Sequence, residues 1–218
     1  MALPQREFPN PPPAPIQMAR RRPIPWFSGA VIGVSAARFL ATSLVGSERW
    51  SLYGPAVQAG EWWRLLAYAV EHGGVLHIVM NMSVVYTLGF GLERLLGTWR
   101  FAVISLVGCL GSAAFALWFN FDTPTVGASG MIISWAGAML PIANRATRQS
   151  LLIWLVQIAV ISFLPFVSWA GHLGGLVFGL PCGLALRAGP RAFPYLAPIL
   201  VFVAAAAAVA VAAGHPMR

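Results

Sequence analysis

Seven apolar runs, each near the length of a membrane-crossing helix, constrain this chain more than any other feature of its sequence. A helix needs about 20 predominantly apolar residues to cross the hydrocarbon core of a bilayer. Only 9% of the residues are charged, whereas a soluble domain has about a quarter. We therefore predict an all-α, polytopic membrane helix bundle. The predicted spans are residues 26–46, 73–92, 98–119, 128–144, 150–167, 170–187 and 194–213.

The arginines predict the orientation of these spans, because cytoplasmic loops carry an excess of basic residues. With a cytoplasmic N-terminus, the inner side holds most arginines and one nearby acid: Arg20, Arg21, Arg22, Arg94, Arg100, Arg145, Arg148, Arg187 and Arg191, with Glu93. The outer side holds Arg49, Arg64 and Arg218, with Glu48, Glu61, Glu71 and Asp122. This bias also explains the net charge of +8, so no nucleic-acid partner is predicted. Glu93 and Arg94 are interpreted as a solvated or interfacial pair.

The ends of the chain predict its division into domains. Residues 1–25 are rich in proline and arginine and lack the apolar stretch and cleavage site of a signal peptide. We expect a disordered cytoplasmic tail over 1–25, a membrane domain over 26–190, and an additional C-terminal span with a short tail over 191–218. Arginine as the sole basic residue, abundant alanine and no evident transit peptide favour a bacterial inner membrane. Cys109 and Cys182 lie in apolar runs, which indicates buried thiols rather than a disulfide or metal site.

Three spans carry, near the same end, a side chain that could take part in catalysis. In the predicted topology the second, fourth and sixth spans all run from outside to inside, and His77, Ser129 and His172 lie near their starts. The fourth span is short. A helix that begins below the outer surface, after residues 120–127 enter the membrane, would put Ser129 at the floor of a water-filled cavity.

These side chains offer a nucleophile, a base and an oxyanion site. Ser129 would attack a carbonyl carbon while His172 takes its proton and passes it to the leaving amine. The Ser129 backbone N–H, with His77 and Asn81 one helical turn apart, would bind the oxyanion. No acidic residue falls inside a predicted span, so the sequence predicts a Ser–His dyad.

Glycines surround these candidates. Gly127 and Gly130 flank Ser129 at the start of the fourth span, where glycine allows unusual backbone angles and close approach. In "GHLGGLVFG", Gly175 and Gly179 lie on one side of the sixth span and predict close helix packing, with Gly137 as the matching position on the fourth span.

With these motifs, the chain resembles the rhomboid family of intramembrane serine proteases over roughly residues 50–187. The family's GxSG motif is present at 127–130, HxxxN at 77–81, and the last histidine motif as "AGHLGGLVFG". The segment "GEWWRLLAYAVEHGGVLH" is similar to the family's first-loop WR motif and its continuation into the second span. In the correct order, the three motifs are specific, although a lone GxSG is weak.

The resemblance implies a rhomboid-like six-helix core plus a seventh C-terminal span. It implies an endopeptidase, without metal or cofactor, that lies in the lipid bilayer and cleaves transmembrane segments of single-span proteins, with its site toward the outer side. The roles it implies are nucleophile for Ser129, base for His172, oxyanion donors for His77 and Asn81, shaping of the active-site loop for Gly127, and a structural or hydrogen-bonding role for His72.

Two other functions compete with this interpretation. Family members often carry an aromatic residue four positions after the serine, stacked on the catalytic histidine, and this chain has Ile133. A catalytically silent relative that binds transmembrane segments as a chaperone or adaptor is therefore the alternative. A transporter using its histidines would predict acids inside the spans and internal repeats, and the sequence shows neither.

Overall fold

The computed structural model describes residues 24–44, 50–164 and 167–216, so almost all of the tail predicted over 1–25 lies outside the described residues. Within them the regular structure is helical, apart from one isolated antiparallel bridge between Leu52 and Thr125. The elements in chain order are α1 (Trp26–Leu44), α2 (Gly54–Gln58), α3 (Arg64–Ala67), the 3₁₀ turn η1 (Tyr68–Val70), α4 (Val75–Val84), the π-helical turn η2 (Val85–Gly89), α5 (Phe90–Leu96), α6 (Thr98–Phe119), α7 (Ser129–Met139), α8 (Arg145–Ile161), α9 (Trp169–Arg187) and α10 (Phe193–Gly214).

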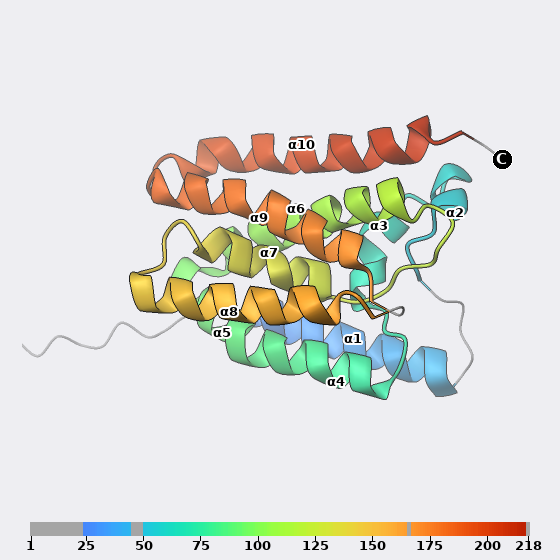
Figure 1. Ribbon diagram of the computed structural model, residues 1–218, viewed down its shortest axis with the longest axis horizontal. Helices are drawn as coiled ribbons and strands as arrows, with labels where there is room; N and C mark the ends of the chain where they lie inside the picture. Colours follow the sequence, from blue (N-terminus) through green and yellow to red (C-terminus); the bar gives the residue numbers. More distant parts are fainter. Residues whose placement is uncertain (1–23, 45–49, 165–166, 217–218) are drawn as a thin grey trace, which may run out of the picture.

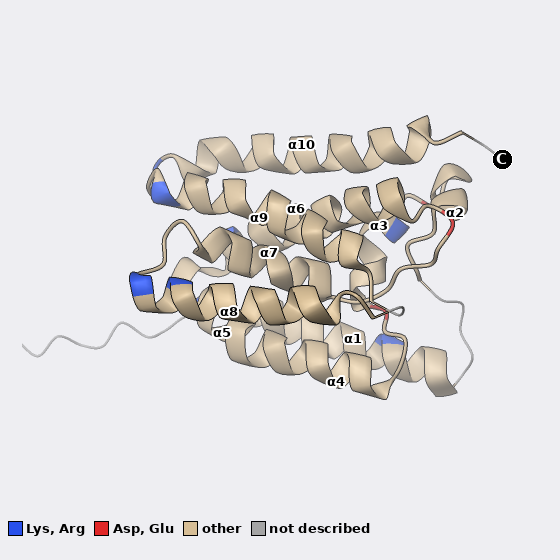
Figure 2. Ribbon diagram, viewed as in Figure 1, with Lys and Arg blue, Asp and Glu red and all other residues tan. Residues whose placement is uncertain are grey.

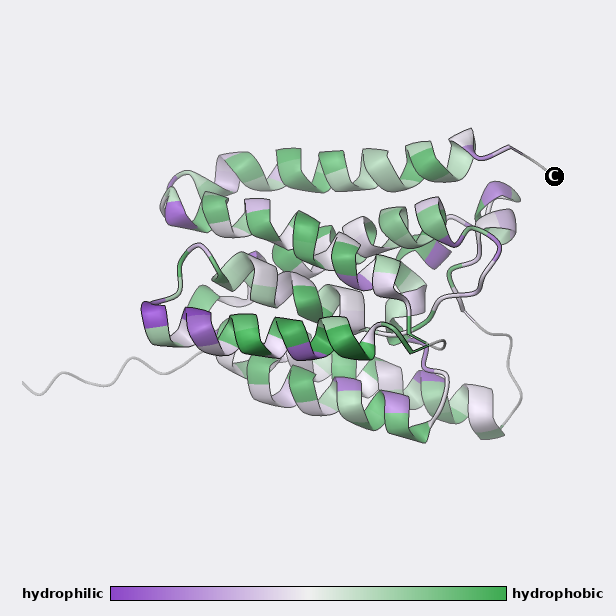
Figure 3. Ribbon diagram, in the orientation of Figure 1, coloured by the Kyte–Doolittle hydropathy of each residue, from purple (hydrophilic) through white to green (hydrophobic). Residues whose placement is uncertain are grey.

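The long helices lie side by side along one direction (Figure 1). The tightest packing joins α7 to α9 and α6 to both of them, with α10 against α6. The helix α6 is the most buried of the long helices. Hydrophobic residues run along α8 and α10, whereas hydrophilic residues gather mostly at helix ends and in connections (Figure 3).

Five helical segments in the described part of the chain are long and apolar enough to cross a membrane: Trp26–Leu44, Val75–Leu96, Thr98–Phe119, Trp169–Arg187 and Phe193–Gly214. The third predicted span, 98–119, coincides with α6 at both ends, and the last agrees with α10 to within one residue. The second continues without a break to Leu96 through the π-helical turn. Hydropathy alone therefore locates most of the spans.

The helices at the fourth and fifth predicted spans, α7 and α8, are not among these five and differ from the predicted limits. The helix α7 has 11 residues and ends at Met139 instead of 144. The helix α8 starts at Arg145 instead of 150, because the side chain of Asn144 accepts a 2.9 Å hydrogen bond from the N–H of Thr147 and caps it. This polar first turn has too little hydropathy to be recognised as part of a span.

Glycines set the close packing of α9, as predicted from its small-residue ridge. A Cβ at Gly175 would collide with the carbonyl oxygen of Gly130, and one at Gly179 with that of Ser134. At Gly137 on α7, a Cβ would lie 2.8 Å from the carbonyl oxygen of Leu176. The prediction for Gly175, Gly179 and Gly137 is confirmed, and α7 and α9 touch backbone to backbone.

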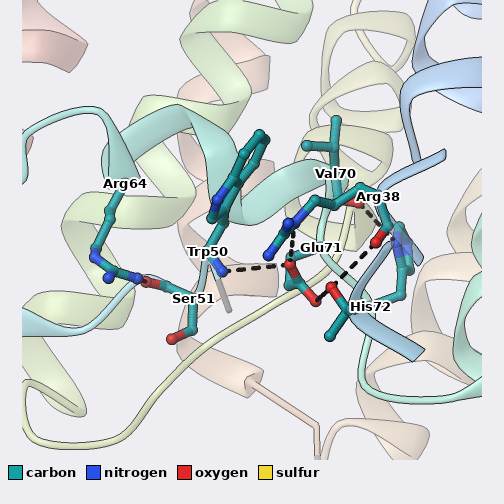
Figure 4. Close-up of polar contacts among 8 residues, drawn as sticks. Arg38, Trp50, Ser51, Arg64, Val70, Glu71 and His72 are labelled. Carbon is teal, nitrogen blue, oxygen red and sulfur yellow. Dashed lines mark hydrogen bonds and ion pairs between the residues drawn. The ribbon is translucent and has the colours of Figure 1, made fainter. Parts of the chain in front are cut away.

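Buried charges hold α1 against the rest of the bundle. Arg38, a charged residue inside the first predicted span, donates a 2.8 Å hydrogen bond from Nε to the fully buried carboxylate of Glu71 (Figure 4). The same carboxylate accepts hydrogen bonds from the hydroxyl of Thr42 at 3.2 Å and the backbone N–H of Trp50 at 3.3 Å. The arginine thus has a specific partner just before α4.

Glu93 is a second buried carboxylate, and its burial corrects the interpretation drawn from the sequence. This residue is 0% exposed, so it forms no solvated or interfacial pair with Arg94. It lies on α5, inside the helical run that extends past the predicted end of the second span. Burial is tolerable because the carboxylate has several hydrogen-bond donors from α1.

Candidate active site

The segment before α7 is fixed by backbone hydrogen bonds. Leu52 and Thr125 exchange two bonds of 2.8 Å, and the N–H of Gly127 donates to the carbonyl of Tyr68 at 2.9 Å. Gly127 has φ +116°, a conformation that favours glycine. After this turn α7 begins at Ser129, whose side chain is half-buried. Ser129 therefore lies at the start of a helix, directly after a fixed turn.

Ser129 meets His172 from the neighbouring helix. The serine Oγ lies 2.8 Å from Nε2 of the histidine, although the two residues are 43 positions apart. His172 sits in the first turn of α9, which is capped by a 3.2 Å hydrogen bond from the N–H of Gly171 to the hydroxyl of Ser168. The glycine-mediated packing of α7 on α9 is what brings the pair within hydrogen-bond distance.

The other ring nitrogen of His172 also has a partner. Its Nδ1 lies 2.6 Å from the hydroxyl of Ser162, which follows the last residue of α8. The Ser162 hydroxyl in turn lies 2.7 Å from the carbonyl oxygen of Ile158. Sequence analysis missed Ser162, because "FLPFVSW" and the residues before it contain no motif that signals this contact.

The first turns of α4 place His77 and Asn81 beside Gly127. Nδ1 of His77 accepts a hydrogen bond from the N–H of Gly73 at 3.4 Å. A Cβ on Gly127 would lie 2.6 Å from Nε2 of His77 and 3.9 Å from Nδ2 of Asn81. One Asn81 amide N–H donates to the His77 carbonyl at 2.9 Å. Both side chains thus face the loop that leads into Ser129.

His72 lies behind His77. The two rings pack edge to face with centroids 5.1 Å apart, and Nδ1 of His72 is 3.3 Å from the Val70 carbonyl oxygen. Burial, followed by the adjacent His77, lowers the pKa of His72 to about 4. His72 is therefore neutral at pH 7, and its place next to Glu71 is visible in Figure 4.

The arrangement suits attack on a carbonyl group. The first backbone N–H groups of a helix have no intrahelical partner, and no side chain caps the start of α7. Developing negative charge can therefore be bound where Ser129 begins the helix. Across the described residues, no three histidine, cysteine or carboxylate side chains gather as a metal site requires.

Comparison with known proteins points to one family. A family model described as "Rhomboid domain" matches residues 59–189, more than half of the chain. The chain is 35% identical over 144 residues to "RHOMBOID-like protein 6, mitochondrial" from Arabidopsis thaliana, covering 62% of this chain and 47% of that protein. The residues matched by the family model, 59–189, include every motif of the candidate site.

Two further relatives carry protease names. "Rhomboid protease GluP" from Bacillus subtilis is 34% identical over 139 residues, or 60% of this chain and 27% of that protein. "Rhomboid-type serine protease 2" from Emericella nidulans is 29% identical over 144 residues, or 61% of this chain and 28% of that protein. The chain spans less than half the length of each of these curated relatives.

Proposed function

The chain belongs to the rhomboid family of integral membrane proteins, and on that premise we propose that it is an intramembrane serine endopeptidase. Ser129 is the proposed nucleophile and His172 the proposed base. The observation that carries the proposal is the 2.8 Å contact between the serine Oγ and the histidine Nε2, which joins two helices at their first turns. A nucleophile within hydrogen-bond reach of a base is the arrangement that covalent catalysis needs.

In the proposed reaction, Ser129 Oγ attacks the scissile carbonyl carbon while its proton moves to Nε2 of His172. The tetrahedral intermediate collapses when the C–N bond breaks and the histidine gives that proton to the leaving amine. Water then attacks the resulting ester, His172 takes a proton from the water, and the serine recovers it as the acid product leaves. A single histidine thus acts as base and then as acid both when the ester forms and when it is hydrolysed.

The proposed oxyanion site combines the backbone N–H of Ser129 with the side chains of His77 and Asn81. Because Nδ1 of His77 accepts from the Gly73 N–H, the proton of the neutral ring resides on Nε2, the nitrogen nearest Gly127. Asn81 keeps one amide N–H beyond the one bonded to the His77 carbonyl. Removing one such donor typically lowers kcat by about a hundred- to thousandfold.

The proposed substrate is a single-span membrane protein, and the proposed active site faces away from the cytoplasm. Support comes from the charge distribution: arginines gather at the end of the bundle where α8 begins and α9 ends, opposite the starts of α7 and α9 (Figure 2). By the positive-inside bias this end is cytoplasmic. We keep a bacterial inner membrane as the proposed location, supported by arginine-only, alanine-rich composition.

Cleavage of a single-span substrate by the purified full chain in detergent tests the proposal. We compare the wild type with Ser129→Ala, His172→Ala and Ser83→Ala. Ser83 is the matched control, because it is an exposed serine on α4 whose hydroxyl bonds only its own helix. The proposal expects cleavage by the wild type and the Ser83 variant, and none by the other two.

The outcomes separate the competing functions. Cleavage by Ser129→Ala would overturn the assigned nucleophile. A wild type that binds the substrate segment but never cuts, and that does not react with a fluorophosphonate serine probe, would instead support the adaptor function that Ile133 suggests.

A further inference from the structure

We propose that Ser162 is a positioning residue that fixes the tautomer and direction of the His172 ring. This inference rests on the proposed function, since it concerns the histidine assigned there as base. It adds a third side chain, from α8, to a pair that sequence analysis interprets as a dyad. The observation behind it is the 2.6 Å contact between Ser162 Oγ and His172 Nδ1.

The direction of each hydrogen bond follows from counting protons. The Ser162 hydroxyl has one hydrogen, and at 2.7 Å the carbonyl of Ile158 is an acceptor only. When Ser162 donates to that carbonyl, its lone pairs are left to face the imidazole. Nδ1 of His172 must then carry the ring proton and donate to Ser162.

This assignment leaves Nε2 unprotonated on the side of Ser129. A neutral imidazole has one N–H, so a proton held on Nδ1 makes Nε2 the acceptor. Nε2 is the atom 2.8 Å from Ser129 Oγ, and a base must have its lone pair there. The chain of bonds from Ser129 through His172 and Ser162 to Ile158 is therefore consistent at every atom.

The same bond restrains the ring without an aromatic side chain four residues after Ser129 to stack on it. Position 133 holds Ile, which is buried within α7 and offers no hydrogen bond. Ser162 is only 6% exposed, so water competes little for Nδ1. The proposed role is therefore orientation by hydrogen bonding in place of orientation by stacking.

Ser162 also links His172 to a helix that is otherwise loosely attached. No residue within α8 is buried, and its main helix contact is α7. The hydroxyl of Ser162, one residue beyond its end, is the polar contact between α8 and the base. Displacement of α8 would release Nδ1 and let the ring turn away from Ser129.

Three variants test the role in steady-state cleavage by the full chain. Ser162→Ala removes the acceptor, and Ser162→Thr restores a hydroxyl able to bond the carbonyl four residues earlier. Ser150→Ala is the matched control, because its exposed hydroxyl makes the same bond to Ala146 on the same helix, 3.2 Å long. We expect Ser162→Ala to lower kcat about tenfold, the rate equivalent of one hydrogen bond, with KM unchanged. Ser162→Thr should recover most of kcat, and Ser150→Ala should match the wild type.

Nitrogen-15 NMR of the ring nitrogens in micelles reports the tautomer without any cleavage, with His172→Ala used for assignment. We expect the proton on Nδ1 in the wild type and Ser162→Thr, and a shift toward the other tautomer in Ser162→Ala. An unchanged tautomer in Ser162→Ala would overturn the inference, as would an unchanged kcat. If the wild type has no protease activity, the proposed function fails, and the NMR comparison still decides whether Ser162 positions the ring.

Discussion

The carboxylate of Glu93 accepts a 2.7 Å hydrogen bond from the hydroxyl of Ser28, across 65 residues of sequence. It also accepts the backbone N–H groups of Phe27 at 2.9 Å and Ser28 at 2.8 Å. These donors belong to the first turn of α1, whose N–H groups would otherwise lack partners. One side chain on α5 therefore caps the first membrane helix and fixes where it packs.

Glu93→Ala is expected to lower the free energy of unfolding by about 2–4 kcal/mol, because several buried donors lose their acceptor together. Glu93→Gln retains one carbonyl acceptor and should lose less. Thermal unfolding in detergent measures both variants. Arg94→Ala, at the exposed neighbouring position, is the control and should lie within about 0.5 kcal/mol of the wild type. Equal losses at the two positions would contradict the capping role.

Gly127→Ala is expected to abolish cleavage with a smaller effect on stability. The position has φ +116°, and the new Cβ would lie 2.6 Å from His77 Nε2, a proposed oxyanion donor. Gly91→Ala is the control, since nothing lies within 4 Å of the added Cβ and alanine favours the helix. Substrate cleavage and thermal unfolding of the two variants separate damage to the site from loss of fold. Cleavage by Gly127→Ala at the rate of the wild type would show that the loop beside His77 has room for a Cβ at position 127.

Gly175→Ala is expected to separate α9 from α7 and to reduce both stability and cleavage. Its Cβ would meet the Gly130 carbonyl, which is backbone and cannot rotate away. Gly29→Ala, where the Cβ meets nothing within 4 Å, provides the control in the same unfolding and cleavage assays. A stable Gly175→Ala variant with full activity would show that the two helices tolerate a wider spacing.

The pH dependence of stability should reveal the buried His72. Burial lowers its pKa from 6.5 to about 4, so the folded state disfavours the charged ring. As the pH falls from about 6.5 toward about 4, the unfolded state takes up the proton first, and stability decreases. His72→Gln removes this contribution. We expect its melting temperature to fall less than that of the wild type between pH 7 and pH 4.5, and parallel declines would contradict the assignment.

Sequence reasoning located most of the spans because hydropathy reports burial in lipid directly. The limits of α6 follow from its apolar run, whereas the start of α8 depends on a cap at Asn144 that hydropathy does not register. Motif order named Ser129 and His172, and the structure brings them together.

The contacts that could not be predicted join elements far apart in the chain. Ser162 touches His172 only because α8 ends beside the first turn of α9. Glu93 is buried only because α5 packs beside the first turn of α1. Neither pairing leaves a periodic pattern in the residues around it. Helix packing decides them, and packing depends on side chains from several helices at once.

As the predicted fifth span, the short helix α8 would make the proposed site sensitive to hydrophobic mismatch. Its 17 residues span roughly 26 Å at 1.5 Å per residue, a few ångströms less than the roughly 30 Å hydrocarbon core of an average bilayer. A short helix responds to longer acyl chains by thinning the bilayer around it or by shifting its ends. Because Ser162 lies at one of those ends, acyl-chain length would change the orientation of the His172 ring as well as the fit of the helix in the bilayer.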